Sequence, residues 1–214
     1  SKEPVPALTV NDKTYIVNTE KAEVLNEYFI SVFTVDNIMM PNFPSNITTE
    51  LKNCFFTPEI VQQALKCIKP LLSSGPDELP PFFIKKLSSH LCVPLSSIFE
   101  VSFRTHKLPQ SWLLSNVVPI HKKGSKNDVA NYRPISLTCI CCRTMESIVK
   151  RHLTQYMTVN QYFSPCQYGF RSQFSTCSQL LYCTNLWTKN IDDRKPVDII
   201  YFDFAKAFDK VCHQ

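Results

Sequence analysis

The sequence predicts an α+β fold, because segments with helical periodicity are combined with two apolar runs that are too short for helices. Residues 114–120 form the first run and residues 198–204 the second. Hydrophobic residues make up 44% of the 214-residue chain and aromatic residues 12%, so the chain can bury a core. No apolar run approaches the roughly 20 residues that a membrane helix needs, so we expect no membrane span.

Several segments repeat apolar residues at helical spacing. Residues 19–33 predict an amphipathic helix. Thr57, Pro58 and Glu59 form a helix start, with an N-cap, a first-turn proline and a first-turn acid. That helix should end near Pro70. Further helical spacing is found in residues 81–106, with an interruption expected at Pro94, in residues 174–187 and towards the end of residues 135–153.

The remaining segments predict strands, turns and loops. Pro119 breaks the run 114–120, which therefore predicts an edge strand. Residues 122–128 predict a basic loop, and the sequence Ser-Ser-Gly-Pro-Asp at residues 73–77 is typical of a turn. Residues 34–56 predict a linker, and residues 198–204 predict a dense apolar strand that contains one carboxylate.

Charge is distributed unevenly along the chain. Residues 1–50 hold 3 basic and 7 acidic side chains, whereas residues 51–214 hold 20 basic and 11 acidic ones. An acidic leading segment therefore precedes a mildly basic domain. A basic domain favours phosphate-bearing partners, although a net charge of this size is also found in domains without such partners.

The ten cysteines do not resemble a secreted disulfide framework, because they lie within apolar runs and no signal segment precedes them. We expect reduced thiols and an intracellular protein. Cys139 and Cys142 form a C-x-x-C pair, but a zinc site would need a second pair at comparable spacing. Packed thiols are the favoured interpretation.

Asp203 is the residue with the clearest chemical implication. It lies among large apolar residues, where a buried carboxylate needs a metal, a cation or hydrogen-bond donors. At the end of a core strand it would suit Mg²⁺, which prefers hard oxygen ligands. The alternative is that Asp203 ends the strand and caps the following turn.

The stretch Ile-Ile-Tyr-Phe-Asp-Phe-Ala-Lys-Ala-Phe-Asp-Lys-Val, residues 199–211, resembles the first catalytic motif of reverse transcriptases from non-LTR retrotransposons of the LINE and jockey type. The resemblance implies that Asp203 is the catalytic, metal-binding aspartate, with Mg²⁺ or Mn²⁺ as cofactor. It also implies that Phe204 and Ala205 lie against the incoming triphosphate. Phe208 matches the bulky residue that excludes a ribose 2′-hydroxyl.

A second block is similar to the fingers segment of the same family. It contains Val-Val-Pro-Ile-His-Lys-Lys-Gly from residue 117 and Asn-Tyr-Arg-Pro-Ile-Ser-Leu from residue 131. In the family a Lys and an Arg bind the nucleotide phosphates, and Lys122 and Arg133 hold the matching positions. The Lys match is loose by one residue, since Lys123 is adjacent. A guanidinium pairs well with phosphate, and Pro134 favours an extended Arg133; otherwise the Lys-Lys loop is a solvated hairpin tip.

Two further blocks complete an ordered set. Gln-Tyr-Gly-Phe-Arg at residues 167–171 resembles the template-side block, which implies template or primer contacts for Gly169 and Arg171. Residues 73–77 with 82–85 resemble the block ahead of the fingers. The resemblance therefore implies a right-hand polymerase, with fingers and the N-terminal part of the palm in residues 57–214. Residues 1–56 are expected to be an acidic leading segment with one helix.

The family performs two-metal phosphoryl transfer with carboxylates from two motifs. The second motif, an apolar residue followed by Ala-Asp-Asp, does not occur after Asp203 in this sequence. Asp192 and Asp193 precede the Asp203 run and have the surroundings of a surface turn. We therefore expect a fragment truncated after the first catalytic motif, with the rest of the palm, the thumb and an endonuclease domain in the full-length protein.

Two functions follow from the resemblance. The first is an RNA-directed DNA polymerase, a nucleotidyltransferase that extends a DNA primer on an RNA template with deoxynucleoside triphosphates. The second is a catalytically inactive, nucleic-acid-binding remnant of that polymerase, which is the favoured state of the isolated chain. A phosphatase-like hydrolase with an Asp nucleophile is disfavoured, because Asp203-Phe204-Ala205 lacks the Asp-x-Asp that such enzymes use.

Overall fold

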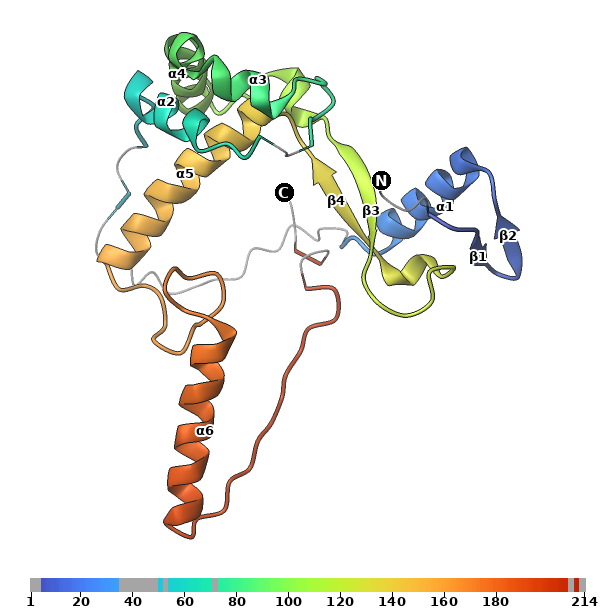
Figure 1. Ribbon diagram of the computed structural model, residues 1–214, viewed down its shortest axis with the longest axis vertical. Coiled ribbons are helices and arrows are strands. Elements are labelled where there is room, and N and C mark those ends of the chain that lie inside the picture. The colour runs from blue at the N-terminus through green and yellow to red at the C-terminus, as the bar shows by residue number, and fades with distance from the viewer. Residues whose placement is uncertain (1–4, 35–49, 52–53, 71–72, 208–209, 212–214) are drawn as a thin grey trace. The chain divides into compact units, whose positions relative to one another are not determined.

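The computed structural model, shown in Figure 1, combines helices with antiparallel hairpins and so confirms the predicted α+β class. Its contacts divide the chain into two units, residues 1–152 with 206–214 and residues 153–205. The structure describes residues 5–34, 50–51, 54–70, 73–207 and 210–211. Most of the expected linker, residues 34–56, lies outside these ranges.

The first unit begins with a small hairpin that the sequence analysis did not predict. Strand β1, Leu8–Val10, pairs with strand β2, Lys13–Tyr15. The two residues between the strands have positive φ, 49° at Asn11 and 62° at Asp12. Asn and Asp tolerate this conformation, which two-residue hairpin turns require. The Asn-Asp pair was therefore the sequence signal for this hairpin.

Helix α1, Asn18–Ser31, follows this hairpin and confirms the helix predicted at residues 19–33. Its buried face and β1 form a small core with two residues from the loop end of the second hairpin, described below. The buried apolar members of this core are Leu8, Val24, Leu25, Phe29, Val129 and Tyr132. The N-terminal elements are thus anchored to the loop end of the second hairpin.

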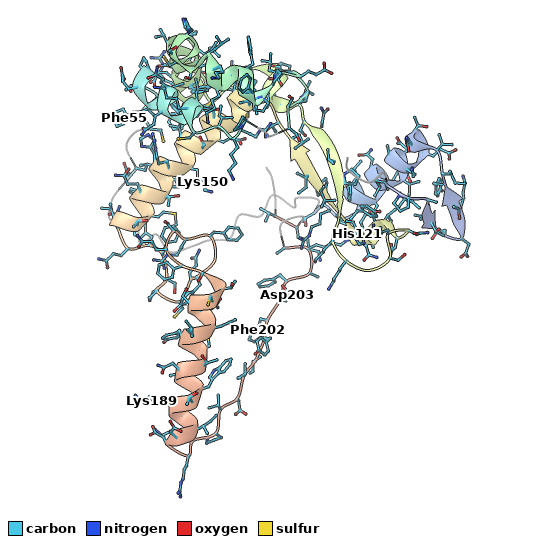
Figure 2. The ribbon with its side chains drawn as sticks, viewed as in Figure 1. Phe55, His121, Lys150, Lys189, Phe202 and Asp203 are labelled. Atoms are coloured by element: carbon cyan, nitrogen blue, oxygen red, sulfur yellow. The ribbon has the colours of Figure 1, made fainter. Side chains whose placement is uncertain are left out.

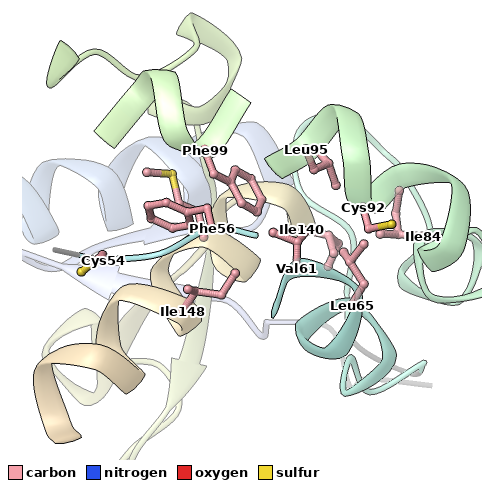
Figure 3. Packing of buried hydrophobic residues seen from close by; sticks show 11 residues of the cluster. Cys54, Phe56, Val61, Leu65, Ile84, Cys92, Leu95, Phe99, Ile140 and Ile148 are labelled. Atoms are coloured by element: carbon pink, nitrogen blue, oxygen red, sulfur yellow. The ribbon is translucent and has the colours of Figure 1, made fainter. Parts of the chain in front are cut away.

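Four helices surround the larger core of the first unit (Figure 3). They are α2, Pro58–Lys66, α3, Pro81–Lys86, α4, Ser88–Thr105, and α5, Ile140–Val159. The Thr57 hydroxyl accepts a hydrogen bond from the Ile60 amide, which confirms the predicted N-cap of α2. Phe99 lies fully buried in this core, with its ring 5.9 Å from that of Phe56 and 5.7 Å from that of Trp112.

The predicted helix interruption at Pro94 was wrong. Pro94 lies inside α4, and the break falls at Leu87, between α3 and α4. A proline removes one backbone hydrogen bond from a helix. Here Leu95 and Phe99 continue the buried face of α4 into the helical core. Burial of these two side chains offsets the lost bond, so the helix continues through the proline.

The second hairpin joins strand β3, Asn116–His121, to strand β4, Tyr132–Leu137. Pro119 is paired with Pro134. Because each strand has only one partner in this two-stranded sheet, the prolines need not donate to a second neighbour. The edge strand predicted near residues 114–120 and the extended Arg133 are thereby confirmed. Two short 3-10 helices, Gln110–Leu113 and Val129–Asn131, precede β3 and β4 respectively.

Gly75 lies in the predicted turn, where the Glu78 amide donates to its carbonyl, at a point of close backbone approach. A Cβ atom on Gly75 would lie 2.6 Å from the Cys139 nitrogen and 2.6 Å from its Cα atom. The Arg143 guanidinium also holds this turn, because it donates to the Ser73 carbonyl over 2.7 Å. Only a residue without a side chain therefore fits between the turn and the start of α5.

We expect Gly75→Ala to lower the free energy of unfolding by about 1–3 kcal/mol, the usual cost of overpacking. The urea midpoint of this chain, followed by far-UV circular dichroism, measures the change. Gly169→Ala is the matched control, because a Cβ atom there would meet nothing within 4 Å. Equal midpoints for the two variants would show that the close approach at Gly75 does not limit stability.

The second unit contains α6, Thr176–Asp192, and the extended segment that follows it. Helix α6 confirms the helix predicted at residues 174–187. The Ser175 hydroxyl accepts from the Ser178 amide, and the Ser178 hydroxyl accepts from the Ser175 amide, which forms a capping box. No residue of α6 is buried.

The strand predicted at residues 198–204 is absent from the structure, where these residues are extended but unpaired. Tyr201, Phe202 and Phe204 are more than four-fifths exposed. A strand is stabilised by hydrogen bonds to a neighbouring strand, and no described strand pairs with this segment. The apolar pattern therefore cannot form a strand by itself. Within the described residues, no helix is both long and apolar enough to cross a membrane.

Candidate functional site

The β3–β4 hairpin places Lys122 and Arg133 on one face. Arg133 is paired with Ile120, and the Lys122 amide donates to the Asn131 carbonyl over 2.8 Å, which continues the ladder by one step. Side chains directly opposite each other share a face, and so do residues two apart along a strand. Lys122, two residues after Ile120, therefore lies on the face that carries Arg133. Both side chains are exposed.

The loop between these strands is held in shape by its own polar groups. The Asn131 side-chain amide donates to the Ser125 carbonyl over 3.0 Å, and the Tyr132 hydroxyl donates to the Lys126 carbonyl over 2.7 Å. Gly124 has a φ of 80°, which favours glycine. Burial raises the pKa of Tyr132, which keeps this hydroxyl protonated as a donor. These contacts hold the predicted basic loop, which carries the lysines, in one conformation.

Lys123 follows Lys122 and lies beyond the hydrogen-bonded pairs of the hairpin. Alternation directs neighbouring strand residues to opposite faces, so Lys123 does not share the face of Arg133. The opposite face carries His121 and Tyr132, whose rings lie 5.6 Å apart, and Figure 2 marks His121 on the hairpin. The hairpin register therefore favours Lys122 over Lys123 as the companion of Arg133.

Asp203, Phe204 and Ala205 belong to the second unit and are exposed. Figure 2 shows Phe202 and Asp203 on the extended segment that follows α6. Phe208, which was predicted to contact the sugar, lies outside the described residues. The sequence argument for a buried carboxylate at Asp203 does not hold in this structure, because the side chain is open to solvent.

The carboxylate of Asp203 is a hard oxygen donor of the kind that Mg²⁺ prefers. Among the described residues, however, no group of three or more His, Cys, Asp or Glu side chains could hold a metal ion. Asp193 is paired with Lys195 over 3.2 Å, in the surface turn that the sequence predicted. Asp203 therefore fits as one ligand of a metal ion, and the remaining ligands are not provided by the described part of the chain.

Gly169 and Arg171 lie together in the loop that precedes α6. The Arg171 guanidinium donates to the Ser164 carbonyl over 2.9 Å and to the Gln167 carbonyl over 3.2 Å. It also lies 4.0 Å from the Phe174 ring centroid, a cation–π distance. In this structure Arg171 thus braces its own loop.

The cysteines of the C-x-x-C segment are packed free thiols. The Cys142 amide donates to the Cys139 sulfur over 3.4 Å at the start of α5. Burial raises the pKa of Cys141 to about 11 and that of Cys142 to about 12, with Glu146 adding to the rise at Cys142. Such thiols stay protonated at neutral pH, and thiolates are the form that binds zinc.

The sequence that carries these site residues can be compared with known protein families. Residues 120–214 match the sequence model of the family described as reverse transcriptase (RNA-dependent DNA polymerase). The matched range begins within β3 and contains Lys122, Arg133, Arg171 and Asp203. Over these residues the chain is similar to reverse transcriptases, and the resemblance found from its motifs is confirmed.

Relatives from mobile elements support the same assignment. The chain is 28% identical over 156 residues to the probable RNA-directed DNA polymerase from transposon BS of Drosophila melanogaster, an alignment that covers 72% of this chain and 17% of the relative. It is 29% identical over 140 residues to the RNA-directed DNA polymerase from mobile element jockey of the same species, covering 65% of this chain and 15% of the relative. The probable polymerase from transposon X-element is 26% identical over 140 residues, with 65% and 15% covered. This chain thus spans about a sixth of the length of these curated relatives.

Proposed function

We propose that this chain is part of an RNA-directed DNA polymerase of a mobile element, which adds deoxynucleotides to a primer 3′-hydroxyl on an RNA template. The observation that carries the proposal is the shared exposed face of Lys122 and Arg133, on an ordered hairpin within the family-matched residues. Partners would be the RNA template, the DNA primer and deoxynucleoside triphosphates.

The Lys122 and Arg133 pair suits a triphosphate. A guanidinium binds two phosphate oxygens in a fixed geometry, whereas an ammonium supplies a compact charge on a flexible stem. The hairpin register fixes their backbones on neighbouring positions of one face. We infer that β3 and β4 belong to the fingers and that residues 198–204 begin the palm, within a polymerase domain of residues 57–214 that follows a leading segment of residues 1–56.

Asp203 would hold Mg²⁺ or Mn²⁺ near the incoming nucleotide, with Phe204, Ala205 and Phe208 beside its triphosphate and sugar. The metal ions supply charge stabilisation to the attacking and leaving oxygens of the transfer. Because no group of three or more metal-ligating side chains is found among the described residues, we propose that the isolated chain binds substrates without extending a primer. This is the catalytically inactive, nucleic-acid-binding state, and salt-sensitive binding of an RNA–DNA duplex without extension would identify it.

The complete protein would contain more than this chain provides. Its relatives are several times longer, and we propose that the remaining palm, a thumb and an endonuclease domain accompany these residues in the full-length polymerase. We also propose an intracellular location, in keeping with the free thiols at every described cysteine.

The nucleotide-binding role can be tested by titrating a fluorescent deoxynucleoside triphosphate into the chain with Mg²⁺. We expect Lys122→Ala and Arg133→Ala each to weaken binding roughly 10-fold or more, since a hydrogen bond to a charged group contributes about 1.5–3 kcal/mol. Lys123→Ala is the matched control. It removes the same charge from the neighbouring residue, and we expect a change within about twofold.

Two results would contradict the proposal in different ways. An equal loss in Lys122→Ala and Lys123→Ala would mean that the loop acts only through its summed charge and that the shared face is irrelevant. A wild-type chain that binds neither the triphosphate nor an RNA–DNA duplex at low salt would remove the polymerase assignment for these residues.

A further inference from the structure

Helix α1 lies beside strand β3 (Figure 1), and a pocket of about 480 Å³ lies between them. The helix contributes one stripe of side chains, from Asn18 to Phe29, and Val117 and Pro119 of β3 form the facing wall. Leu25 and Phe29 are buried members of the small core around α1, so the floor of the pocket is apolar and is part of the fold. Small-molecule sites usually have volumes of roughly 300–1,000 Å³.

Lys21 is the charged residue of this pocket. It is only 8% exposed, although lysine normally keeps its ammonium group in water. The Lys21 Nζ atom donates to the Val5 carbonyl over 2.7 Å. An ammonium group has three N–H donors, and among the described residues the Val5 carbonyl is the only acceptor for the Lys21 ammonium. Two donors are therefore left for a group that enters the pocket.

The surroundings of Lys21 do not supply a balancing charge. A buried cation needs an anion or suitable acceptors to offset its loss of solvent. The acidic residues of α1, Glu20, Glu23 and Glu27, are exposed and do not line the pocket. Within the described part of the chain, no other acidic residue lines it either. The pocket therefore combines a positive charge with an apolar floor, which is complementary to an anion with an apolar body.

The charge of the complementary anion follows from the cations that line the pocket. Lys21 is the only charged lining residue that the structure describes. One ammonium group balances the single charge of a carboxylate, whereas a phosphate monoester carries about −1.5 to −2 charges at neutral pH. The oxygens of a carboxylate also suit the two remaining donors of Lys21. Asn18 and Asn26, which are exposed, add neutral polar groups at the rim.

We propose that this pocket binds a small apolar carboxylate, whose charged group pairs with Lys21 while its hydrocarbon body lies against Leu25, Phe29 and Pro119. The proposal goes beyond the polymerase function and does not depend on it, because every residue involved belongs to α1, its preceding segment or the outer part of β3. The sequence analysis gave Lys21 no role, although its position four residues before Leu25 placed it on the apolar face of the predicted helix.

The test titrates the chain with biphenyl-4-carboxylate and with its neutral analogue, biphenyl-4-carboxamide, by isothermal titration calorimetry. We expect the wild type to bind the carboxylate about 10-fold or more tightly than the amide, since hydrogen bonds to charged groups are the stronger ones. Lys21→Met keeps a side chain of similar length without the charge. It should weaken carboxylate binding about 10-fold and leave amide binding within about twofold of the wild type.

Two further variants control for charge and for the pocket itself. Lys13→Met removes the same charge from an exposed residue of β2 that does not line the pocket, and its carboxylate binding should stay within about twofold. Ala22→Trp keeps Lys21 but fills the pocket that Ala22 lines, so it should abolish binding of both compounds.

Several results would overturn the proposal. These are equal affinities of the wild type for carboxylate and amide, equal losses in Lys21→Met and Lys13→Met, and unchanged binding in Ala22→Trp. Absence of any binding by the wild type would also overturn it. Tighter binding of biphenyl-4-yl phosphate than of the carboxylate would show that the pocket prefers a higher charge. None of these results would affect the nucleotide-binding role of Lys122 and Arg133, which is measured separately.

Discussion

Asp203→Ala is expected to reduce primer extension about a thousandfold or more, in a polymerase that contains this chain together with the second carboxylate motif. Metal ions contribute several kcal/mol of charge stabilisation to phosphoryl transfer, and each 1.4 kcal/mol is a factor of ten in rate. Loss of a metal-binding carboxylate therefore removes most of the rate. Incorporation of labelled deoxynucleotide on an RNA template with Mg²⁺ measures the effect.

The control for this experiment is Asp198→Ala. Asp198 lies in the same extended segment and is also exposed, but the family motif gives it no role. Its extension rate should stay close to that of the wild type. Both variants should bind the RNA–DNA primer–template as the unaltered protein does, which separates a catalytic loss from a folding loss. Extension by the Asp203→Ala protein at an unreduced rate would refute the metal-binding role of Asp203.

Phe99→Ala is expected to lower the free energy of unfolding of this chain by about 3–5 kcal/mol, the typical cost of truncating a buried phenylalanine. Phe99 is fully buried in the helical core and contacts the rings of Phe56 and Trp112. Its removal would leave a cavity among α2, α4 and α5, where these side chains meet (Figure 3). Since a domain is stable by only about 5–15 kcal/mol, the loss would consume a large share of the total.

Urea unfolding followed by far-UV circular dichroism measures this change, and the midpoint should fall by at least about 1 M. Val101→Ala is the matched control, because Val101 lies on the same helix with its side chain 49% exposed. Its effect should stay within about 0.5 kcal/mol. A Phe99→Ala midpoint that equals that of Val101→Ala would show that the helical core does not carry the stability of the chain.

Features governed by neighbouring residues could be predicted from the sequence. Thr57, Pro58 and Glu59 are sufficient to start α2, because the capping group, the fixed φ and the first-turn acid all act within one turn. The edge strand that became β3, the basic loop and the extended Arg133 followed in the same way, from an apolar run, prolines and turn residues. The family resemblance also came from ordered local motifs, and the family match includes three of them, at Arg133, Arg171 and Asp203.

The failed predictions concern features that depend on packing partners. A proline such as Pro94 is expected to interrupt a helix, yet α4 continues past it because Leu95 and Phe99 are buried in the core. The apolar pattern around Asp203 predicts a strand, yet a strand requires hydrogen bonds from a neighbour, and no described strand supplies them. Whether α4 continues past Pro94 and whether the segment around Asp203 forms a strand both depend on residues that are distant in the sequence.

The sequence by itself thus determined where α2 begins, where the edge strand and the basic loop lie and which family the motifs resemble, because each of these depends on short-range geometry and residue chemistry. Only the tertiary structure decided that Lys122 rather than Lys123 shares the face of Arg133, since strand register sets the face. It also decided that Arg171 braces the loop before α6, because its contacts join residues several positions apart in the sequence.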